Sequence, residues 1–185
     1  MPESALAPSC WKNVAVNYVK SMRLYYAFIT GISGWVGVAF YQFLFPGSVS
    51  PLRSGLILGL LFLSWGVNQI VNDVLGLKED RLNAPNRPLV TGALPLKPAL
   101  GISAAAIALT LGLAWVLNPL SVAPALAGIL LNVVYEYAKR HSLWGNAVFG
   151  VMIAMCPLFG FLASGPTPAP CSPAIVCPCS CSLPC

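Results

Sequence analysis

Residues 54–72 read SGLILGLLFLSWGVNQIVN, a run without a charged side chain that ends directly before Asp73. The hydrocarbon core of a bilayer is about 30 Å thick and an α-helix rises about 1.5 Å per residue, so a run of this length suits one membrane span. Comparable uncharged runs cover residues 24–45, 98–117, 120–135 and 143–163. The sequence therefore predicts an all-α, multi-pass transmembrane helical bundle of about five spans.

Proline and glycine mark the expected ends of these spans. Pro46-Gly47 closes the first span, and Asn118-Pro119 separates the third from the fourth, because the residue before a proline is pushed out of the helical region. The fourth run is short, and we expect Pro124 to interrupt it. Small residues such as those at Gly31, Gly34 and Gly37 are typical of close helix packing in lipid.

Composition indicates a lipid environment for most of the surface. The chain has 185 residues, of which 57% are hydrophobic and only 8% charged, and its mean hydropathy is +0.78. Ordinary soluble domains carry about a quarter charged residues. The net charge of +5 does not indicate nucleic-acid binding, because the basic residues lie between long uncharged runs and form no stripe. The expected partner of the surface is the lipid bilayer.

The distribution of lysine and arginine predicts the orientation. With five spans, nine of the ten basic residues fall on one side, in the amino-terminal segment and in the segments after the second and fourth spans. These are Lys12, Lys20, Arg23, Lys78, Arg81, Arg87, Lys97, Lys139 and Arg140. Arg53 stands alone on the other side. The positive-inside rule therefore predicts a cytoplasmic amino terminus and a cytoplasmic loop between the second and third spans.

Polar side chains gather where the second span ends. Asn68 and Asn72 are one helical turn apart, and Asp73 and Asp80 would share a face if the helix continued. Acids at membrane depth are costly and are therefore functional candidates. Carboxylate and amide oxygens suit Mg²⁺, which binds through one or two carboxylates and substrate phosphates. The alternative is that residues 78–87 form an ordinary charged cytoplasmic loop.

Two motifs resemble those of the UbiA-type membrane prenyltransferases. The first aspartate-rich motif of that family reads N-D-x-x-D-x-x-x-D, followed by N-R-P and a turn. This chain has Asn72-Asp73, Gly76 where the middle acid belongs, Asp80, and then NRPLVTG over residues 86–92. Residues 135–140, YEYAKR, with Gly-Asn at 145–146, resemble the Y-x-x-x-K-R and G-N of the family. Arg23 fits a basic residue usual before the first span, and the resemblance covers about residues 12–164.

The resemblance implies a Mg²⁺-dependent transferase. In the family, aspartates hold Mg²⁺ on the diphosphate of a polyprenyl donor, basic residues neutralise the remaining charge, and an aromatic or other lipophilic acceptor captures the carbocation. Carried over by position, the expected metal ligands are Asn72, Asp73 and Asp80. The expected catalytic residues are Asp73, Asp80, Lys139 and Tyr135, the last lining the pocket or steadying the cation. The expected substrate-binding residues are Asn68, Asn72, Arg87 and Arg140.

Two departures from the family pattern leave an alternative open. Gly76 replaces an acid, in which case Glu79 or Asn68 is the alternative ligand, and Glu136 is expected to form a structural ion pair with Lys139 or Arg140. The family has about nine helices and a second aspartate-rich motif, whereas this chain has five acidic residues in all. The expected bundle is roughly half of the nine-helix one. The alternative function is a truncated, catalytically inactive paralogue with a structural or weak-binding role. Self-association could supply the missing half.

The carboxyl-terminal segment differs from the rest. Residues 1–164 form the expected UbiA-like region, and residues 165–185 form a Pro/Cys-rich tail that cannot make a helix, because proline recurs every few residues. We expect this tail to be disordered and to reflect a shifted reading frame or an altered splice. Its cysteine spacing fits no usual zinc pattern, although disulfides are possible if the tail is extracellular.

Overall fold

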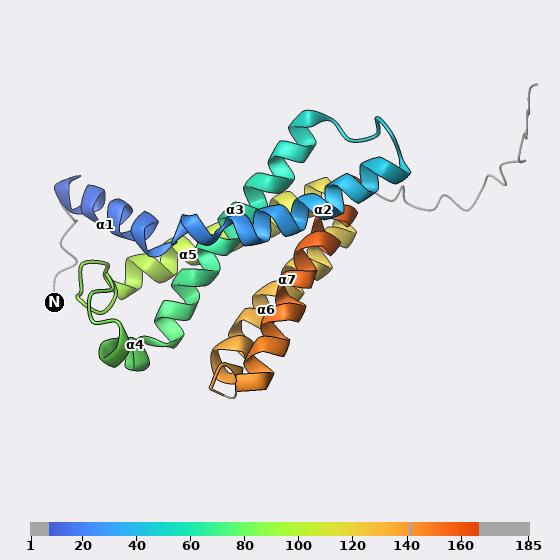
Figure 1. Ribbon diagram of the computed structural model, residues 1–185. Helices are drawn as coiled ribbons and strands as arrows, with labels where there is room; N and C mark the ends of the chain where they lie inside the picture. The colour runs from blue at the N-terminus through green and yellow to red at the C-terminus, as the bar shows by residue number, and fades with distance from the viewer. Residues whose placement is uncertain (1–7, 141, 167–185) are drawn as a thin grey trace, which may run out of the picture.

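The computed structural model describes residues 8–140 and 142–166, and within these residues all regular secondary structure is helical (Figure 1). The predicted all-α fold class is therefore confirmed. The elements are α1 (Pro8–Ser21), η1 (Leu24–Tyr26), α2 (Phe28–Leu44), α3 (Pro51–Leu75), α4 (Leu77–Asn83), α5 (Leu96–Leu117), η2 (Pro119–Ser121), α6 (Val122–Ala138) and α7 (Ser142–Ser164). The predicted tail lies outside the described residues from 167 onward.

Four helices are long and apolar enough to cross a membrane: α3, α5, α6 with η2, and α7. A fifth span exists if the pair formed by residues 11–26 and α2, bent by 58°, counts as one. The first predicted span needs a correction, because no continuous helix runs from residue 24. Arg23 adopts left-handed backbone angles (φ 47°, ψ 50°), and a single 3₁₀ turn follows before α2 begins at Phe28.

Pro124 does not interrupt the fourth span. It lies in the first turn of α6, which begins at Val122, and the N–H groups of a first helical turn have no partner within the helix. The missing N–H of proline therefore costs nothing there. The proline within a helix is instead Pro157, in the middle of α7.

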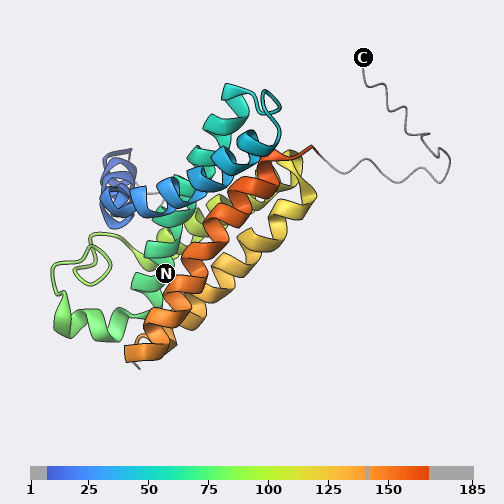
Figure 2. The same cartoon turned by 45° about the vertical axis from the view of Figure 1, so that its right-hand side comes forward.

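Glycines allow α2 and α7 to pack with their backbones in contact (Figures 1 and 2). A Cβ atom added at Gly37 would lie 2.0 Å from the carbonyl oxygen of Pro157, and one at Gly160 would lie 2.2 Å from the carbonyl oxygen of Gly34. Neither backbone oxygen can move aside as a flexible side chain would. The small residues of α2 therefore do serve helix packing, as predicted.

Arg53, on the side opposite the other basic residues, links the ends of three helices. Its guanidinium donates to the carbonyl oxygens of Ala163 at 2.8 Å, Leu117 at 2.6 Å and Gly165. These carbonyls end α5 and α7, where backbone acceptors lack helical partners and the helix dipole is negative. Arg53 thus fastens the start of α3 to the ends of two other helices.

Candidate functional site

The carboxyl ends of α3 and α6 and the turn before α2 enclose a cavity of about 360 Å³. In both views α4 and the α6–α7 turn lie toward the same end of the bundle (Figures 1 and 2). The cavity is lined by Arg23, Tyr26, Ile29, Trp65, Gln69, Asn72, Asp73, Arg87, Tyr135, Glu136, Lys139, Phe149 and Met152. This is a polar wall at the charged end of an otherwise apolar bundle.

Asp73 is the buried centre of one charged group. It is 2% exposed, and its carboxylate accepts from Arg23 Nη2 at 2.7 and 3.0 Å and from Arg87 Nη1 at 3.0 Å. Arg23 also donates to Gln69 Oε1 at 3.1 Å. A buried carboxylate is tolerated only when it is paired and hydrogen-bonded, and here two arginines supply the pairing.

Asp80 joins this group even though the helix does not continue to it. The α3 helix ends at Leu75, Gly76 caps it, and Asp80 lies on the separate helix α4. Arg87 Nη1 pairs with both Asp80 Oδ2 and Asp73 Oδ1. The two aspartates predicted to act together are thus united by an arginine rather than by a shared helix face.

Local backbone geometry places both arginines. The left-handed conformation of Arg23 is uncommon for a residue other than glycine and persists only where surrounding contacts hold it. Its paired bonds to Asp73 are such contacts. Arg87 lies in a compact loop in which Arg87 O accepts from Val90 and Thr91, and Gly92, with φ 77°, turns the chain toward α5. The turn thus holds the backbone of Arg87, while Asp73 and Asp80 hold its side chain.

A second charged group comes from the end of α6. Lys139 Nζ pairs with Glu136 Oε1 and lies 3.4 Å from Glu79 Oε2, and Arg140 Nη2 lies 2.8 Å from Glu79 Oε1. The predicted ion pair of Glu136 therefore forms with Lys139. Burial lowers the pKa of the Lys139 ammonium, but the hydrogen bond and charge of Glu136, and those of Glu79, raise this pKa by more, so it lies above its usual value.

Charges balance across the two groups. All four acidic residues in the described part of the chain are ion-paired, with four basic partners. No three or more His, Cys, Asp or Glu side chains converge there as a ready metal site. Among these described residues, Asn72 Oδ1 is buried without a hydrogen-bond partner although Asn72 lines the cavity. A cation entering the cavity would have to share carboxylates with arginine or lysine.

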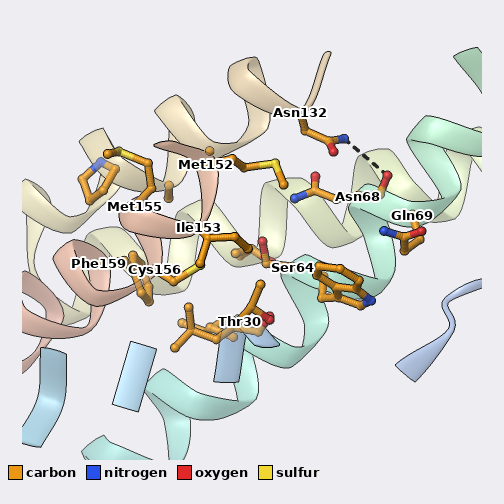
Figure 3. A pocket seen from close by; sticks show the side chains of 17 residues that line it. Thr30, Ser64, Asn68, Gln69, Asn132, Met152, Ile153, Met155, Cys156 and Phe159 are labelled. Carbon is orange, nitrogen blue, oxygen red and sulfur yellow. Dashed lines mark hydrogen bonds between the residues drawn. The ribbon is translucent and has the colours of Figure 1, made fainter. Parts of the chain in front are cut away.

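Behind the charged wall lies a narrower pocket of about 60 Å³ inside the bundle (Figure 3). Its walls are mainly apolar, with Met152, Cys156 and Phe159 facing a few polar groups. Trp65, Gln69 and Met152 line both spaces, so the pocket adjoins the cavity. The arrangement joins a charged opening to a greasy interior.

The structure brings most of the predicted site residues together. Asn72, Asp73, Arg87, Tyr135 and Lys139 line the cavity, where Tyr135 lies beside Phe149 with ring centroids 5.6 Å apart. Asp80 lies behind Arg87.

The other predicted residues lie elsewhere. Asn68 lines the inner pocket, and its backbone carbonyl oxygen accepts a hydrogen bond from Asn132 Nδ2 at 3.3 Å. Arg140 is 62% exposed and pairs with Glu79 outside the cavity. Sequence reasoning did not assign Gln69 or Glu136 to the site. Gln69 gives no motif signal, whereas Glu136 is an acid inside the second motif and could have been suspected.

The long apolar helices and the charged cavity at one end of the bundle define an integral membrane protein. The family model described as UbiA prenyltransferase family matches residues 23–183, and the chain belongs to this family.

Its relatives include digeranylgeranylglyceryl phosphate synthases of archaea. The enzyme of Methanococcoides burtonii is 30% identical over 77% of this chain and 53% of its own length, and that of Thermococcus sibiricus is 31% identical over 80% and 52%. A solved structure, described as giving insights into the biosynthesis of digeranylgeranylglyceryl phosphate synthase in membranes, has a TM-score of 0.71 at 26% identity. The match covers 80% of this chain and 53% of that one. The chain thus spans about half the length of these relatives.

Proposed function

We propose that the cavity binds the diphosphate of a polyprenyl donor together with Mg²⁺, and that the protein transfers the prenyl group to a lipophilic acceptor. The observation that carries this proposal is that Arg23 and Arg87, which pair with buried Asp73, and Lys139, which pairs with Glu136, line one cavity. Arginine and lysine are the usual partners of phosphate oxygens. An apolar pocket adjoins the cavity, as an isoprenoid chain requires.

The residues present fit a divalent cation. Asn72 Oδ1 is a buried oxygen without a partner, and one guanidinium of Arg87 bridges Asp73 and Asp80, which shows that both carboxylates can approach a single positive group. We assign the cation to Asn72, Asp73 and Asp80, with diphosphate oxygens and water as its other ligands. Bound there, Mg²⁺ would stabilise negative charge developing on the departing diphosphate.

The protein's own residues would act through charge and shape. In the described structure the arginines are neutralised by carboxylates, so an entering diphosphate exchanges partners with them rather than meeting bare cations. Arg23, Arg87 and Lys139 then hold the leaving group, and Arg140 acts at the rim. Tyr135 would flank the reacting carbon of the donor. Asn68 and the inner pocket would orient the prenyl chain and exclude water from the carbocation left when the diphosphate departs.

The relatives suggest the acceptor. They are synthases of digeranylgeranylglyceryl phosphate, which favours a glyceryl phosphate lipid that already carries one geranylgeranyl group over an aromatic ring. The one-sided distribution of basic residues supports a site on the cytoplasmic face. We also propose that residues 1–164 form the region that carries the site and that residues 165–185 are a separate tail, although the family match extends to residue 183.

The test is transfer of radiolabelled geranylgeranyl diphosphate to geranylgeranylglyceryl phosphate by membranes containing the chain. We expect a labelled lipid product that depends on Mg²⁺ and is lost in Lys139→Met. Binding of the donor without transfer would favour the alternative of an inactive, weak-binding paralogue. The absence of both transfer and Mg²⁺-dependent donor binding would refute the proposal.

A further inference from the structure

Glu136 is a buried carboxylate in the cavity wall that faces the end of α3. It is 4% exposed and lines the same cavity as Asn72 and Asp73, although it comes from α6. Its ion-pair partner is Lys139, three residues along the same helix, and that side chain is 31% exposed. An ion pair between neighbours on one helix needs no burial, so pairing alone does not explain why this carboxylate faces inward.

Gly76 shows which space Glu136 fills. A Cβ atom added at Gly76 would lie 2.6 Å from Glu136 Oε1 and 3.4 Å from Lys139 Nζ. The backbone of Gly76 has φ −89° and ψ 11°, which does not require glycine. The carboxylate of Glu136 thus stands where a side chain at position 76 would enter, and such a side chain would have to displace it.

Position 76 caps α3 three residues after Asp73, between the proposed cation ligands of α3 and Asp80 of α4. We propose that Glu136 is a further carboxylate of the cation and diphosphate site, presented by α6 to the space that Gly76 leaves open. When the donor binds, Lys139 turns to the phosphate oxygens and Glu136 becomes available to the cation. This inference rests on the proposed function and adds a ligand from a third helix, α6, to those of α3 and α4.

The experiment measures binding of radiolabelled inorganic diphosphate by the full chain in lipid nanodiscs as a function of Mn²⁺ concentration, with Mn²⁺ standing in for Mg²⁺. We expect the half-saturating Mn²⁺ concentration to rise at least about tenfold in Glu136→Gln and Glu136→Ala. Placing the acid on the residue that caps α3 instead, in the double variant Gly76→Asp with Glu136→Ala, should restore the half-saturating Mn²⁺ concentration to within about threefold of the wild type.

Glu79→Gln is the matched control, because it removes the other carboxylate partner of Lys139, and the Glu79 side chain is 35% exposed and lies outside the cavity. We expect its Mn²⁺ dependence to match that of the wild type. Thermal unfolding of each variant separates lost folding from lost binding.

An unchanged half-saturating Mn²⁺ concentration in both Glu136 variants would overturn the inference while leaving the proposed function intact. A half-saturating concentration that is higher in the double variant than in Glu136→Ala alone would do the same. A shift confined to Glu79→Gln would also overturn it. A wild-type chain that binds no diphosphate at any Mn²⁺ concentration would overturn the proposed function and the inference together.

Discussion

Replacing Asp73 by asparagine should change how diphosphate binding depends on metal, rather than simply abolish binding. The wild-type cluster is balanced, since Asp73 and Asp80 face Arg23 and Arg87. Asparagine keeps the shape of aspartate but leaves the cluster with one net positive charge. The two arginines would then be less neutralised, so metal-free diphosphate should bind more tightly than it does in the wild type, while the contribution of Mg²⁺ is lost.

Two magnitudes follow from the burial and contacts of Asp73. Removing one member of a buried ion pair typically costs about 3–5 kcal/mol. Because the side chains of Arg23 and Arg87 are 22% and 31% exposed and can be rehydrated, we expect a smaller loss than this, about 2–3 kcal/mol of unfolding free energy. Loss of a metal ligand should raise the half-saturating Mg²⁺ concentration about 100-fold or more, and a 100-fold change corresponds to about 2.7 kcal/mol of binding free energy.

The assay titrates Mg²⁺ against binding of radiolabelled inorganic diphosphate in nanodiscs, with a chelator series for the metal-free limit. Glu79→Gln is the control, since it also removes one negative charge but lies outside the cavity. If Asp73→Asn kept the wild-type Mg²⁺ dependence, or if metal-free binding fell, the reasoning about a shared arginine and cation site would be refuted.

Three further predictions concern the scaffold and pH. Gly37→Ala should lower the unfolding free energy by about 1–3 kcal/mol, because its Cβ would meet the Pro157 backbone. Gly150→Ala is the control and should raise the unfolding free energy by about 0.5–1 kcal/mol, because its Cβ has no described atom within 4 Å. Equal effects of the two substitutions in thermal unfolding would contradict this. Arg53→Met should cost about 2–3 kcal/mol by leaving helix-end carbonyls unpaired, and a variant as stable as the wild type in the same assay would count against this link between helices. The pKa of Lys139 is raised in the folded state. Its ion pairs therefore contribute fully to the free energy of unfolding below the unfolded-state pKa of about 10.4, and this contribution is lost as the pH rises through the folded-state pKa. The stability difference between the wild type and Lys139→Met should therefore stay constant from about pH 7 to pH 10 and shrink above it; a change near neutral pH would exclude this explanation.

Hydrophobic run length was enough to predict the bundle. Each uncharged run after the first corresponds to one helix, because lipid requires every backbone group to be bonded within its own segment. The break before α2 could not be predicted, because no nearby residue signals the left-handed backbone of Arg23, whose side chain pairs with Asp73 far along the chain. Pro124 was misjudged because its place in the first turn of α6 depends on where the helix starts.

The candidate site was predicted where motif spacing reports local geometry and missed where tertiary contacts decide. Asp73, Arg87 and Lys139 were named from the two motifs and do line one cavity. Sequence spacing predicts that Asp73 and Asp80 share a helix face if the helix continues. The helix ends at Gly76 instead, and Arg87 pairs with both aspartates.

Glu136 was interpreted only as a helix-surface ion pair. Its role against Gly76 depends on a contact between α3 and α6, which neither segment reveals by itself.

The central claim is that the cavity between α3 and α6 binds a prenyl diphosphate through a divalent cation. Equilibrium binding of radiolabelled geranylgeranyl diphosphate to the wild-type chain in nanodiscs, with Mg²⁺ or with a chelator, tests it most directly. The account predicts retention that requires Mg²⁺ and is displaced by excess inorganic diphosphate. Retention that is indifferent to both the chelator and inorganic diphosphate would mean that only the lipid chain is recognised, and would contradict it.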